Sequence, residues 1–356
     1  MRPPFSLSGA EAIAETIAAR DYNNLYRTSC FFRDVERYRA FCAQYAIMRV
    51  VDDRIDALPS RSTLSSDARR AEQKIVMAWR HAVTAAHRGQ TADFSPLMSH
   101  LVHPQAGDLL EALTGACERF PVPLSLWDNF FDAMEWDLER SRFRTYQEFL
   151  GYAEGATVAP TTIYLYLLSA SEQADGRYRP PDDFDLIRCG RALGIFSYLG
   201  HILRDLPDDL STGGDGLLYF AADDLSRHHL TEEMLFADLA AGRGSEALRG
   251  LVADLAGRGR ADLAEGRGYL TALDGRLTPD CTFILELIIT IYEAVLTKIE
   301  ACGYDPMARR HHLTDEEKDR IAFEVARRTA FLPTPGPRRA GGQSRPPPFP
   351  PPGSGQ

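Results

Sequence analysis

Hydrophobic positions recur every three or four residues along most of the chain, which is the period of an amphipathic α-helix. No convincing run alternates apolar and polar residues as a half-buried strand does. The pattern therefore predicts an all-α protein. The expected helices cover residues 8–20, 34–58, 66–88, 107–118, 124–141, 145–169, 184–210, 231–241, 245–273, 279–302 and 314–329.

The segments between these helices are rich in Gly, Pro and Ser, and none is long enough to read as a domain linker. We therefore expect one helical domain over residues 1–333. Residues 334–356 contain the run RPPPFPPP and little that a core could bury, which is typical of a disordered, Pro/Gly-rich tail.

Composition and charge narrow the class of protein. A formal net charge of −10 argues against nucleic acid as a partner, because binding phosphates needs Lys- and Arg-rich surfaces. The six cysteines form no C-x-x-C pair and the N-terminus lacks a continuous apolar run, so we expect a cytoplasmic protein without disulfides. The apolar stretch 283–296 is interrupted by Glu286 and Glu293, which favours a buried helix and at most peripheral membrane contact.

Two pairs of aspartates break the amphipathic pattern. On a helix, Asp52 lies in line with Met48 and Tyr45 on an apolar stripe, and Asp56 follows one turn later. A solvated helix face would place its acids opposite such a stripe. Carboxylates one turn apart repel each other, and burial adds to the cost unless a cation lies between them.

The second pair repeats this arrangement. Asp205 follows His201 and Tyr198 on one helical stripe, and Asp209 comes one turn later. Mg²⁺ prefers oxygen ligands and takes one or two carboxylates together with substrate phosphates. Two such pairs facing each other across a bundle predict a Mg²⁺-lined mouth on an apolar cavity, whose ligand has a diphosphate head and a hydrocarbon tail.

An arginine near each pair fits the same ligand. Arg49 precedes Asp52 by three residues, and Arg204 directly precedes Asp205, so both could hold a departing diphosphate. The alternative for each pair is a salt-bridged helix face without a metal.

Several segments resemble the squalene and phytoene synthase family, the head-to-head prenyl diphosphate synthases. RAFCAQYAIMRVVDDRID (39–56) is similar to the first aspartate-rich signature of the family, and LGIFSYLGHILRDLPDDL (193–210) is similar to the second. FDAMEWDLERSRFRTYQEFLGYAEGATV (131–158) resembles the segment between them, and IYEAVLTKIEACGY (291–304) is a weaker match.

The resemblance implies an isoprenoid synthase fold, a single large helical bundle around a central cavity. It implies two prenyl diphosphates, farnesyl or geranylgeranyl, joined head to head through a cyclopropylcarbinyl diphosphate. Carried over by position, the metal ligands are Asp52, Asp56, Asp205 and Asp209, with Arg49 and Arg204 beside the diphosphate. Tyr45, Asp137 and Tyr292 become polar residues of the cavity.

The sequence departs from the family at several positions near the site. His201 stands where the family usually has Asn, and Tyr198 stands where Gln is common. Asn23 replaces part of a serine-rich stretch and could donate to a diphosphate. A family tyrosine corresponds to Leu150, or to Tyr152 if the helix is locally shorter. Ala159 and Pro160 replace a glycine, which predicts a narrowed or kinked helix.

These departures leave two other hypotheses open. The same ionisation could lead to cyclisation of one substrate or to prenylation of a different acceptor. A non-catalytic assembly module is the third hypothesis, although retention of all four motif aspartates argues against it.

Overall fold

The computed structural model describes residues 5–7, 9–58, 63–90, 102–211, 217–307 and 311–331, and the tail expected at 334–356 lies outside them. Its α-helices are α1 (Gly9–Ala18), α2 (Asn24–Ser29), α3 (Val35–Asp56), α4 (Ser66–His87), α5 (Ala106–Arg119), α6 (Leu124–Glu139), α7 (Tyr146–Ala153), α8 (Ala159–Ser169), α9 (Leu186–Ser211), α10 (Ala222–Arg227), α11 (Glu232–Ala241), α12 (Glu246–Leu270), α13 (Pro279–Ala301) and α14 (Asp315–Arg328). Short turns are η1 (Arg20–Tyr22), η2 (Glu154–Val158) and η3 (Thr271–Leu273). Two strands, β1 (Ser171–Glu172) and β2 (Tyr178–Arg179), form an antiparallel hairpin.

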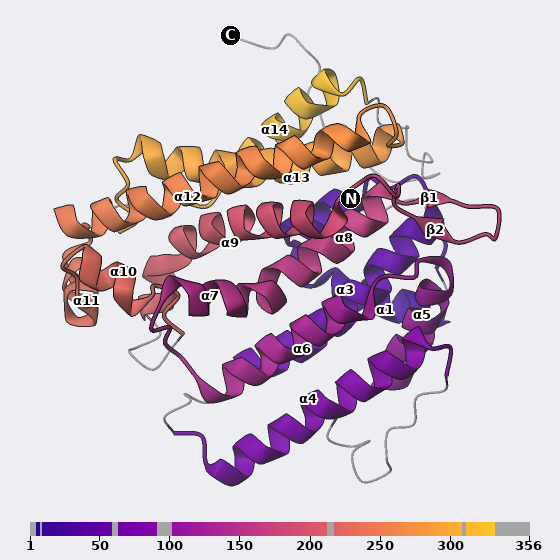
Figure 1. Cartoon of the computed structure of the whole chain (residues 1–356), viewed down its shortest axis with the longest axis horizontal. Coiled ribbons are helices and arrows are strands. Elements are labelled where there is room, and N and C mark those ends of the chain that lie inside the picture. Colours follow the sequence, from indigo (N-terminus) through magenta and orange to yellow (C-terminus); the bar gives the residue numbers. More distant parts are fainter. Residues whose placement is uncertain are drawn as a thin grey trace, which may run out of the picture.

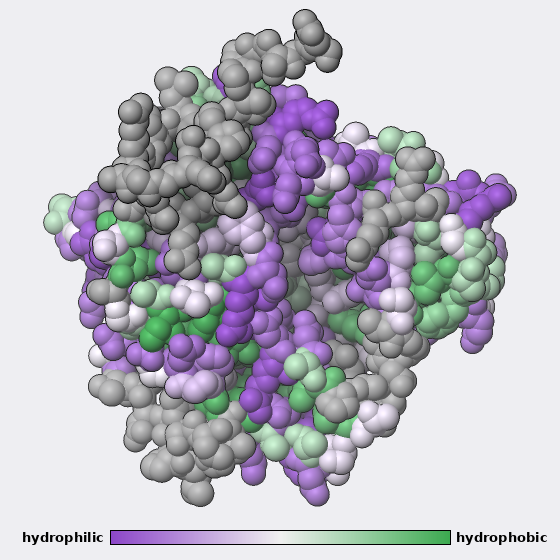
Figure 2. Space-filling view, turned by 180° about the vertical axis from the view of Figure 1, so that it is seen from behind, coloured by the Kyte–Doolittle hydropathy of each residue, from purple (hydrophilic) through white to green (hydrophobic). Residues whose placement is uncertain are grey.

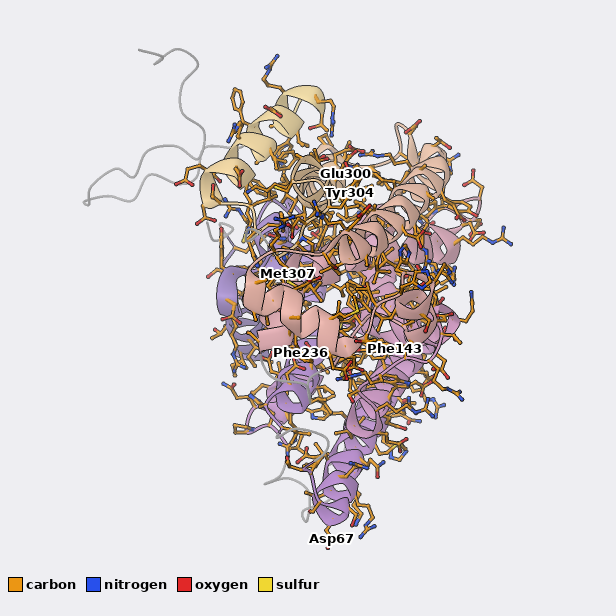
Figure 3. The ribbon with its side chains drawn as sticks, turned by 90° about the vertical axis from the view of Figure 1, so that its left-hand side faces the viewer. Asp67, Phe143, Phe236, Glu300, Tyr304 and Met307 are labelled. Atoms are coloured by element: carbon orange, nitrogen blue, oxygen red, sulfur yellow. The ribbon has the colours of Figure 1, made fainter. Side chains whose placement is uncertain are left out.

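The helices stack in layers. α12, α13 and α14 lie on one side of α9, and α6 and then α4 follow on the other side (Figure 1). In side view the molecule narrows toward the start of α4, where Asp67 lies, while Glu300 and Tyr304 lie near the opposite end (Figure 3). Buried side chains from α1 to α14 form one continuous hydrophobic cluster, so the expected all-α class is confirmed.

The outer surface is mixed in polarity. Figure 2 shows hydrophilic side chains in a central band on one face, with smaller hydrophobic patches to either side. Among the described residues, we find no helix whose length and apolar character would let it span a membrane. The apolar stretch 283–296 lies within α13, which buries one side in the core, as expected.

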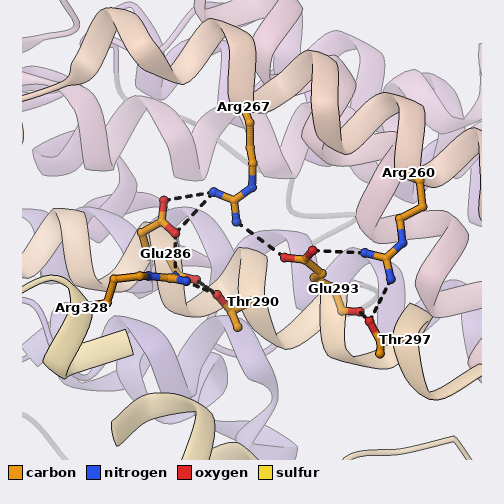
Figure 4. A network of polar contacts seen from close by, with 7 residues as sticks. All are labelled: Arg260, Arg267, Glu286, Thr290, Glu293, Thr297 and Arg328. Atoms are coloured by element: carbon orange, nitrogen blue, oxygen red, sulfur yellow. Dashed lines mark hydrogen bonds and ion pairs between the residues drawn. The ribbon is translucent and has the colours of Figure 1, made fainter. Parts of the chain in front are cut away.

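The other side of α13 carries the two glutamates that interrupt its apolar sequence. Glu286 pairs with Arg267 of α12 and with Arg328 of α14, and Glu293 pairs with Arg260 (Figure 4). These exposed or half-buried pairs are individually weak, but together they tie three helices to one another.

The helix expected over 145–169 is interrupted. α7 and α8 are joined by η2, a π-helical turn in which the N–H of Ala159 donates to the carbonyl of Glu154, five residues earlier. Pro160 follows at once, and because proline has no N–H it cannot continue the regular ladder to Ala156. The expected kink is therefore a π turn, a feature that inserts one residue into a helix.

Two glycines of α9 come into close contact with α8 and with the end of η2. A Cβ atom at Gly190 would lie 2.1 Å from the Oγ1 atom of Thr162, and one at Gly194 would lie 2.9 Å from the Cα atom of Val158. Only glycine lets the two backbones approach this far. The contact fixes how α8 and α9 diverge toward the cavity described next.

Candidate active site

A cavity of about 940 Å³ lies between α3, α6, α8, α9 and α13. Among the described residues, twelve of the thirteen predicted site residues line it: Asn23, Tyr45, Arg49, Asp52, Asp56, Asp137, Tyr152, Tyr198, His201, Arg204, Asp209 and Tyr292. Asp205 is the exception. The wall of the cavity also includes apolar side chains, among them Phe130, Met134, Leu165 and Ile288. The structure thus brings together residues that are more than 250 positions apart in sequence.

Asp52 lies in this wall with an excess of negative charge around it. Burial, followed by the charges of Asp56, Asp137 and Asp53, raises the pKa of Asp52 to about 8. Asp56 is exposed and lines the same cavity one turn later. Asp53 points elsewhere, as its position on the helix predicted, and pairs with Arg49. Burial and the neighbouring carboxylates therefore disfavour the charged form of Asp52, and Arg49 does not offset them.

Arg49 is held in place by two carboxylates. Its Nη2 atom lies 2.9 Å from Oδ2 of Asp21 and 3.1 Å from Oδ1 of Asp53. Asp21 has a φ of 58°, in the left-handed region that costs energy for most residues other than glycine. The two ion pairs leave the guanidinium at the cavity wall, oriented by α3 and by the turn before α2.

Asn23 and Tyr45 are bonded to each other. The Nδ2 atom of Asn23 donates to the hydroxyl of Tyr45 over 2.7 Å, and the Oδ1 atom of Asn23 caps α2 by accepting from the N–H of Tyr26. Burial raises the pKa of Tyr45 to about 12, so the phenol stays protonated. Asn23 thus positions Tyr45 and has less capacity to donate to a ligand than its sequence position suggested.

The second aspartate pair differs from the first. Asp205 accepts hydrogen bonds from Nε and Nη2 of Arg204, and the Nε2 atoms of His201 and His312 lie 2.8 and 3.1 Å from its oxygens. Burial alone would raise the pKa of Asp205, but the hydrogen bonds of Arg204 and His201 outweigh it and hold that pKa well below its usual range. Without a metal ion, Asp205 is therefore paired with Arg204 and His201, as the salt-bridged alternative described above would have it.

The pKa of Asp209, one turn later on α9, shifts in the opposite direction. Burial, followed by the charges of Asp205 and Asp208, raises the pKa of Asp209 to about 7. The charge of Asp56 adds to this shift, which means that the two aspartate pairs lie close enough to repel each other. Both pairs therefore border the same region, as the sequence predicted.

The donor set fits Mg²⁺. Asp52, Asp56 and Asp209 present carboxylate oxygens to one cavity, and burial together with the charge of neighbouring carboxylates raises the pKa of Asp52 and of Asp209, a cost that a divalent cation would relieve. Oxygens of Asp205 and Asp208 and a nitrogen of His312 also lie within 4.8 Å of one another, so Asp205 could join such a site if its present partners move.

A hydrogen-bonded group of phenols occupies the wall between the two pairs. The hydroxyl of Tyr152 donates to Oδ2 of Asp137 over 3.0 Å, and Asp137 is buried. Burial raises the pKa of Tyr152 and of Tyr198 far above the usual range, and both shifts carry a contribution from the hydrogen bond between them. Tyr219 bonds to Tyr198 in turn. Of the two positions considered for the family tyrosine, Tyr152 is the one at the cavity.

Several polar residues line the cavity in addition to the predicted site residues. Asn24 follows Asn23 at the start of α2, Tyr219 follows α9 in an irregular segment, and Lys318 comes from α14. Burial, with the charges of Arg27 and Arg204, lowers the pKa of Lys318. The doublet NN and the aromatic run LLYF were visible signals, whereas nothing near Lys318 in sequence points to a cavity.

Comparisons with known proteins agree on one family. Residues 17–317 match the model of the squalene/phytoene synthase family. Chloroplastic phytoene synthase 3 of Zea mays is 24% identical over 301 residues, which cover 84% of this chain and 61% of that protein. A phytoene synthase of Thermus thermophilus is 27% identical over 259 residues, covering 72% and 76%. The chain thus spans less than two thirds of the length of the chloroplastic relative.

Solved structures show the same fold. A dehydrosqualene synthase bound to a ligand superposes with a TM-score of 0.66 at 17% identity, covering 91% of this chain and 97% of that one. The squalene synthase HpnC of Alicyclobacillus acidocaldarius superposes with a TM-score of 0.63 at 18% identity, covering 83% and 94%. The fold is that of the all-α isoprenoid synthases, and the chain belongs to the squalene/phytoene synthase family.

Proposed function

We propose that this protein is a Mg²⁺-dependent prenyltransferase that joins two prenyl diphosphates head to head, with loss of diphosphate, through a cyclopropylcarbinyl diphosphate. One observation carries the proposal: carboxylates whose pKa values are raised by burial and by one another's charge border a cavity that is also lined by apolar side chains. A diphosphate head with its metal ions would bind at the carboxylates, and a prenyl tail would lie against the apolar side chains of the cavity.

In this proposal Asp52, Asp56, Asp205 and Asp209 hold Mg²⁺, whose charge would neutralise the diphosphate and make it a better leaving group. Arg49 is already oriented by its two carboxylates, so it can meet a diphosphate oxygen without first being ordered. Arg204 is bound to Asp205 and becomes available to the diphosphate when that carboxylate turns to a metal ion.

The interior of the cavity serves the hydrocarbon part of the reaction. When the carbon–oxygen bond to diphosphate breaks, the allylic carbon keeps a positive charge that water would capture. Apolar walls such as Phe130 and Ile288 exclude water, and aromatic faces such as that of Tyr45 favour a cation. The protonated phenols of Tyr152 and Tyr198 are poor nucleophiles, so they do not trap it.

The test is to incubate the full-length protein with Mg²⁺ and farnesyl or geranylgeranyl diphosphate, and to measure pyrophosphate release and the masses of extracted products. We expect pyrophosphate and a product that contains two prenyl units. A product with one unit would instead support cyclisation or a different acceptor. If no pyrophosphate is released from either substrate, the protein is a non-catalytic module and the proposal is wrong.

The proposal extends to the organisation and location of the enzyme. We take residues 1–333 as the catalytic unit, so a chain ending at residue 333 should keep full turnover. A hydrocarbon product does not dissolve in water, which is why we also propose that this cytoplasmic enzyme contacts a membrane peripherally. Co-sedimentation with phospholipid vesicles, with and without substrate, measures that contact.

A further inference from the structure

The outward face of α4 carries a row of basic side chains. α4 packs against α5 and α6 and is the outermost helix on its side of the molecule (Figure 1). Arg70, Lys74 and His81 lie on α4, Arg88 caps its C-terminus, and all four are exposed. At 3.6 residues per turn they fall within about 40° of one another around the helix axis and extend over about 27 Å of it, so they form one basic stripe. Arg70 pairs with Asp67, one turn earlier.

The buried side of α4 shows that the basic stripe points away from the core. The buried residues lie about half a turn from the stripe around the helix axis. They are Ile75, Val76, Trp79, Ala82, Val83 and Ala86. The basic stripe is therefore the solvent face of an amphipathic helix.

Acidic residues that could neutralise the basic stripe are scarce. Between its two ends α4 contains a single acid, Glu72, which pairs with Arg54 of α3. Within the described part of the chain, the side chains of Lys74, His81 and Arg88 form no hydrogen bond or ion pair. Most of the stripe is thus available to a partner outside the protein.

This arrangement is unusual in so acidic a chain. Acidic residues outnumber basic ones by 50 to 40 overall. α14 shows the common pattern of an exposed helix, because Glu316, Asp319, Arg320 and Arg327 bring both signs of charge to its surface. A surface with both signs interspersed is enough for solubility, so solubility does not explain an unpaired basic row.

A flat surface of negative charge fits the basic stripe. Lys and Arg residues close to anionic lipid headgroups are attracted within a Debye length, and each strengthens binding about five-fold. Insertion of apolar side chains is not an alternative in the described part of the chain, because its large exposed hydrophobic residues, Tyr22, Ile187 and Met234, lie on three different elements. Contact with a bilayer would therefore depend on charge.

The reaction proposed above favours lipid over nucleic acid as the anionic partner. A prenyl diphosphate and a hydrocarbon product both partition into lipid, whereas no step of the reaction involves nucleic acid. The basic stripe also begins near one end of the cavity. Leu58 and Leu64, between α3 and α4, line the cavity, and Arg70 follows Leu64 by six residues. A bilayer on α4 would thus lie close to apolar side chains of the cavity.

We propose that the basic stripe binds the anionic headgroups of a lipid bilayer, and that α4 is the face through which this protein contacts the membrane. The inference rests on the peripheral membrane contact included in the proposed function and names its surface and its lipid class. It makes the contact sensitive to salt and independent of substrate.

The first experiment measures binding of the full-length protein, without substrate, to vesicles of phosphatidylcholine alone and to vesicles with about 30 mol% phosphatidylglycerol. Lys74→Gln/Arg88→Gln removes two charges of the basic stripe and keeps good helix formers. Arg177→Gln/Arg243→Gln is the matched control, because both arginines are exposed and lie outside α4, in the turn between β1 and β2 and after α11. The two double variants change the net charge equally.

We expect the parent protein to bind anionic vesicles at least about ten-fold more tightly than neutral ones, and to lose most of that binding between about 0.1 and about 0.5 M salt. The α4 variant should lose at least about ten-fold in affinity for anionic vesicles, and the control less than about two-fold. Equal losses in the two variants, or equal binding of the parent to both kinds of vesicle, would overturn the inference.

The second experiment adds charge instead of removing it. His81→Glu places a carboxylate in the middle of the basic stripe and should weaken binding to anionic vesicles at least about five-fold. Ala240→Glu adds a carboxylate to an exposed position of α11 and should weaken it less than about two-fold. A DNA duplex is the competing probe: tighter binding to DNA than to vesicles, lost in His81→Glu, would assign the stripe to nucleic acid and overturn the proposal.

Product formation is measured separately on the same proteins. Coupled products without any binding to anionic vesicles would refute this inference and leave the proposed reaction intact. Stripe-dependent vesicle binding without pyrophosphate release would refute the proposed reaction and leave the docking face of α4 intact.

Discussion

The Nη2 atom of Arg204 lies 2.5 Å from Oδ2 of Asp205, its neighbour in sequence, and its Nε atom lies 2.7 Å from Oδ1. This pairing separates the behaviour of the two aspartates of α9. The bound arginine keeps Asp205 ionised, while Asp209, one turn later, has a raised pKa. The metal-free site therefore combines an ionised Asp205, held by Arg204, with an Asp209 whose charged form is disfavoured.

Replacing Asp52 by Asn should abolish turnover and stabilise the metal-free protein. The pKa of Asp52 is raised to about 8 in the folded state, so the stability it contributes is fully present below the unfolded value near 4 and is lost as pH rises through 8. Asp52→Asn should therefore add roughly 1–3 kcal/mol to the free energy of unfolding at pH 8 and less at pH 5. Thermal unfolding in EDTA at both pH values measures this.

Asp53→Asn is the matched control for that variant. Asp53 pairs with Arg49 and, at 3.6 Å, with Arg20, so removing its charge should not stabilise the protein at either pH. If Asp52→Asn instead loses stability at pH 8, then Asp52 is a structural partner and not a ligand of a cation.

Binding of Mg²⁺ should strengthen as the pH rises. Asp52 and Asp209, with pKa values near 8 and 7, must lose their protons before they can ligate a metal ion. We expect the affinity for Mg²⁺ alone to rise at least about ten-fold between pH 6 and pH 8. Isothermal titration calorimetry at pH 7, in two buffers of different ionisation enthalpy, should count about one proton released. Absence of proton release would exclude both carboxylates as ligands.

His201→Asn should keep activity. The Nε2 atom of His201 lies 2.8 Å from Asp205 and its side chain is half exposed, so its removal leaves no cavity in the core. Asn offers an amide oxygen, which suits Mg²⁺ better than an imidazole nitrogen does. We expect kcat within about three-fold of the parent for His201→Asn and at least a ten-fold loss for His201→Leu. Equal losses in both variants would show that the imidazole itself is needed.

Gly190→Ala should destabilise the fold. Its Cβ atom would collide with Oγ1 of Thr162, and separating α8 from α9 should cost about 1–3 kcal/mol. Gly151 is also helical, but a Cβ atom there meets nothing within 4 Å, so Gly151→Ala should be neutral or slightly stabilising. Urea unfolding of the two variants measures the contrast. A neutral Gly190→Ala would mean that the two helices can move apart freely.

The sequence predicted helices and candidate site residues best where the residues concerned lie on a single long helix. The positions of Asp52, Asp56 and Asp209 follow from a period of 3.6 residues, and an apolar stripe that continues into acids marks them without knowledge of the fold. The long helices were therefore predicted to within a few residues. The six-residue helices α2 and α10 were missed, because so few residues complete too little of the period.

Other parts of the site depend on contacts that no local pattern encodes. Asp205 lies 3.1 Å from the Nε2 atom of His312, which is more than one hundred residues away in sequence. Lys318 reaches the cavity from α14, whose own sequence reads as an ordinary charged helix with a capping box. Such residues become part of a site only through the packing of distant helices.

The π turn at Glu154–Val158 interrupts the helical segment from Tyr146 to Ser169. The side chains before the turn and those after it therefore do not follow one continuous helical repeat. One extra residue turns what precedes it by about 100° relative to a continuous helix. Tyr152 thus shares the cavity wall with Thr161 and Tyr164 only because of that turn. Loss of a single residue there would rotate the phenol of Tyr152 out of the cavity wall, although Tyr152 itself and the residues of α8 that line the cavity would all remain in the chain.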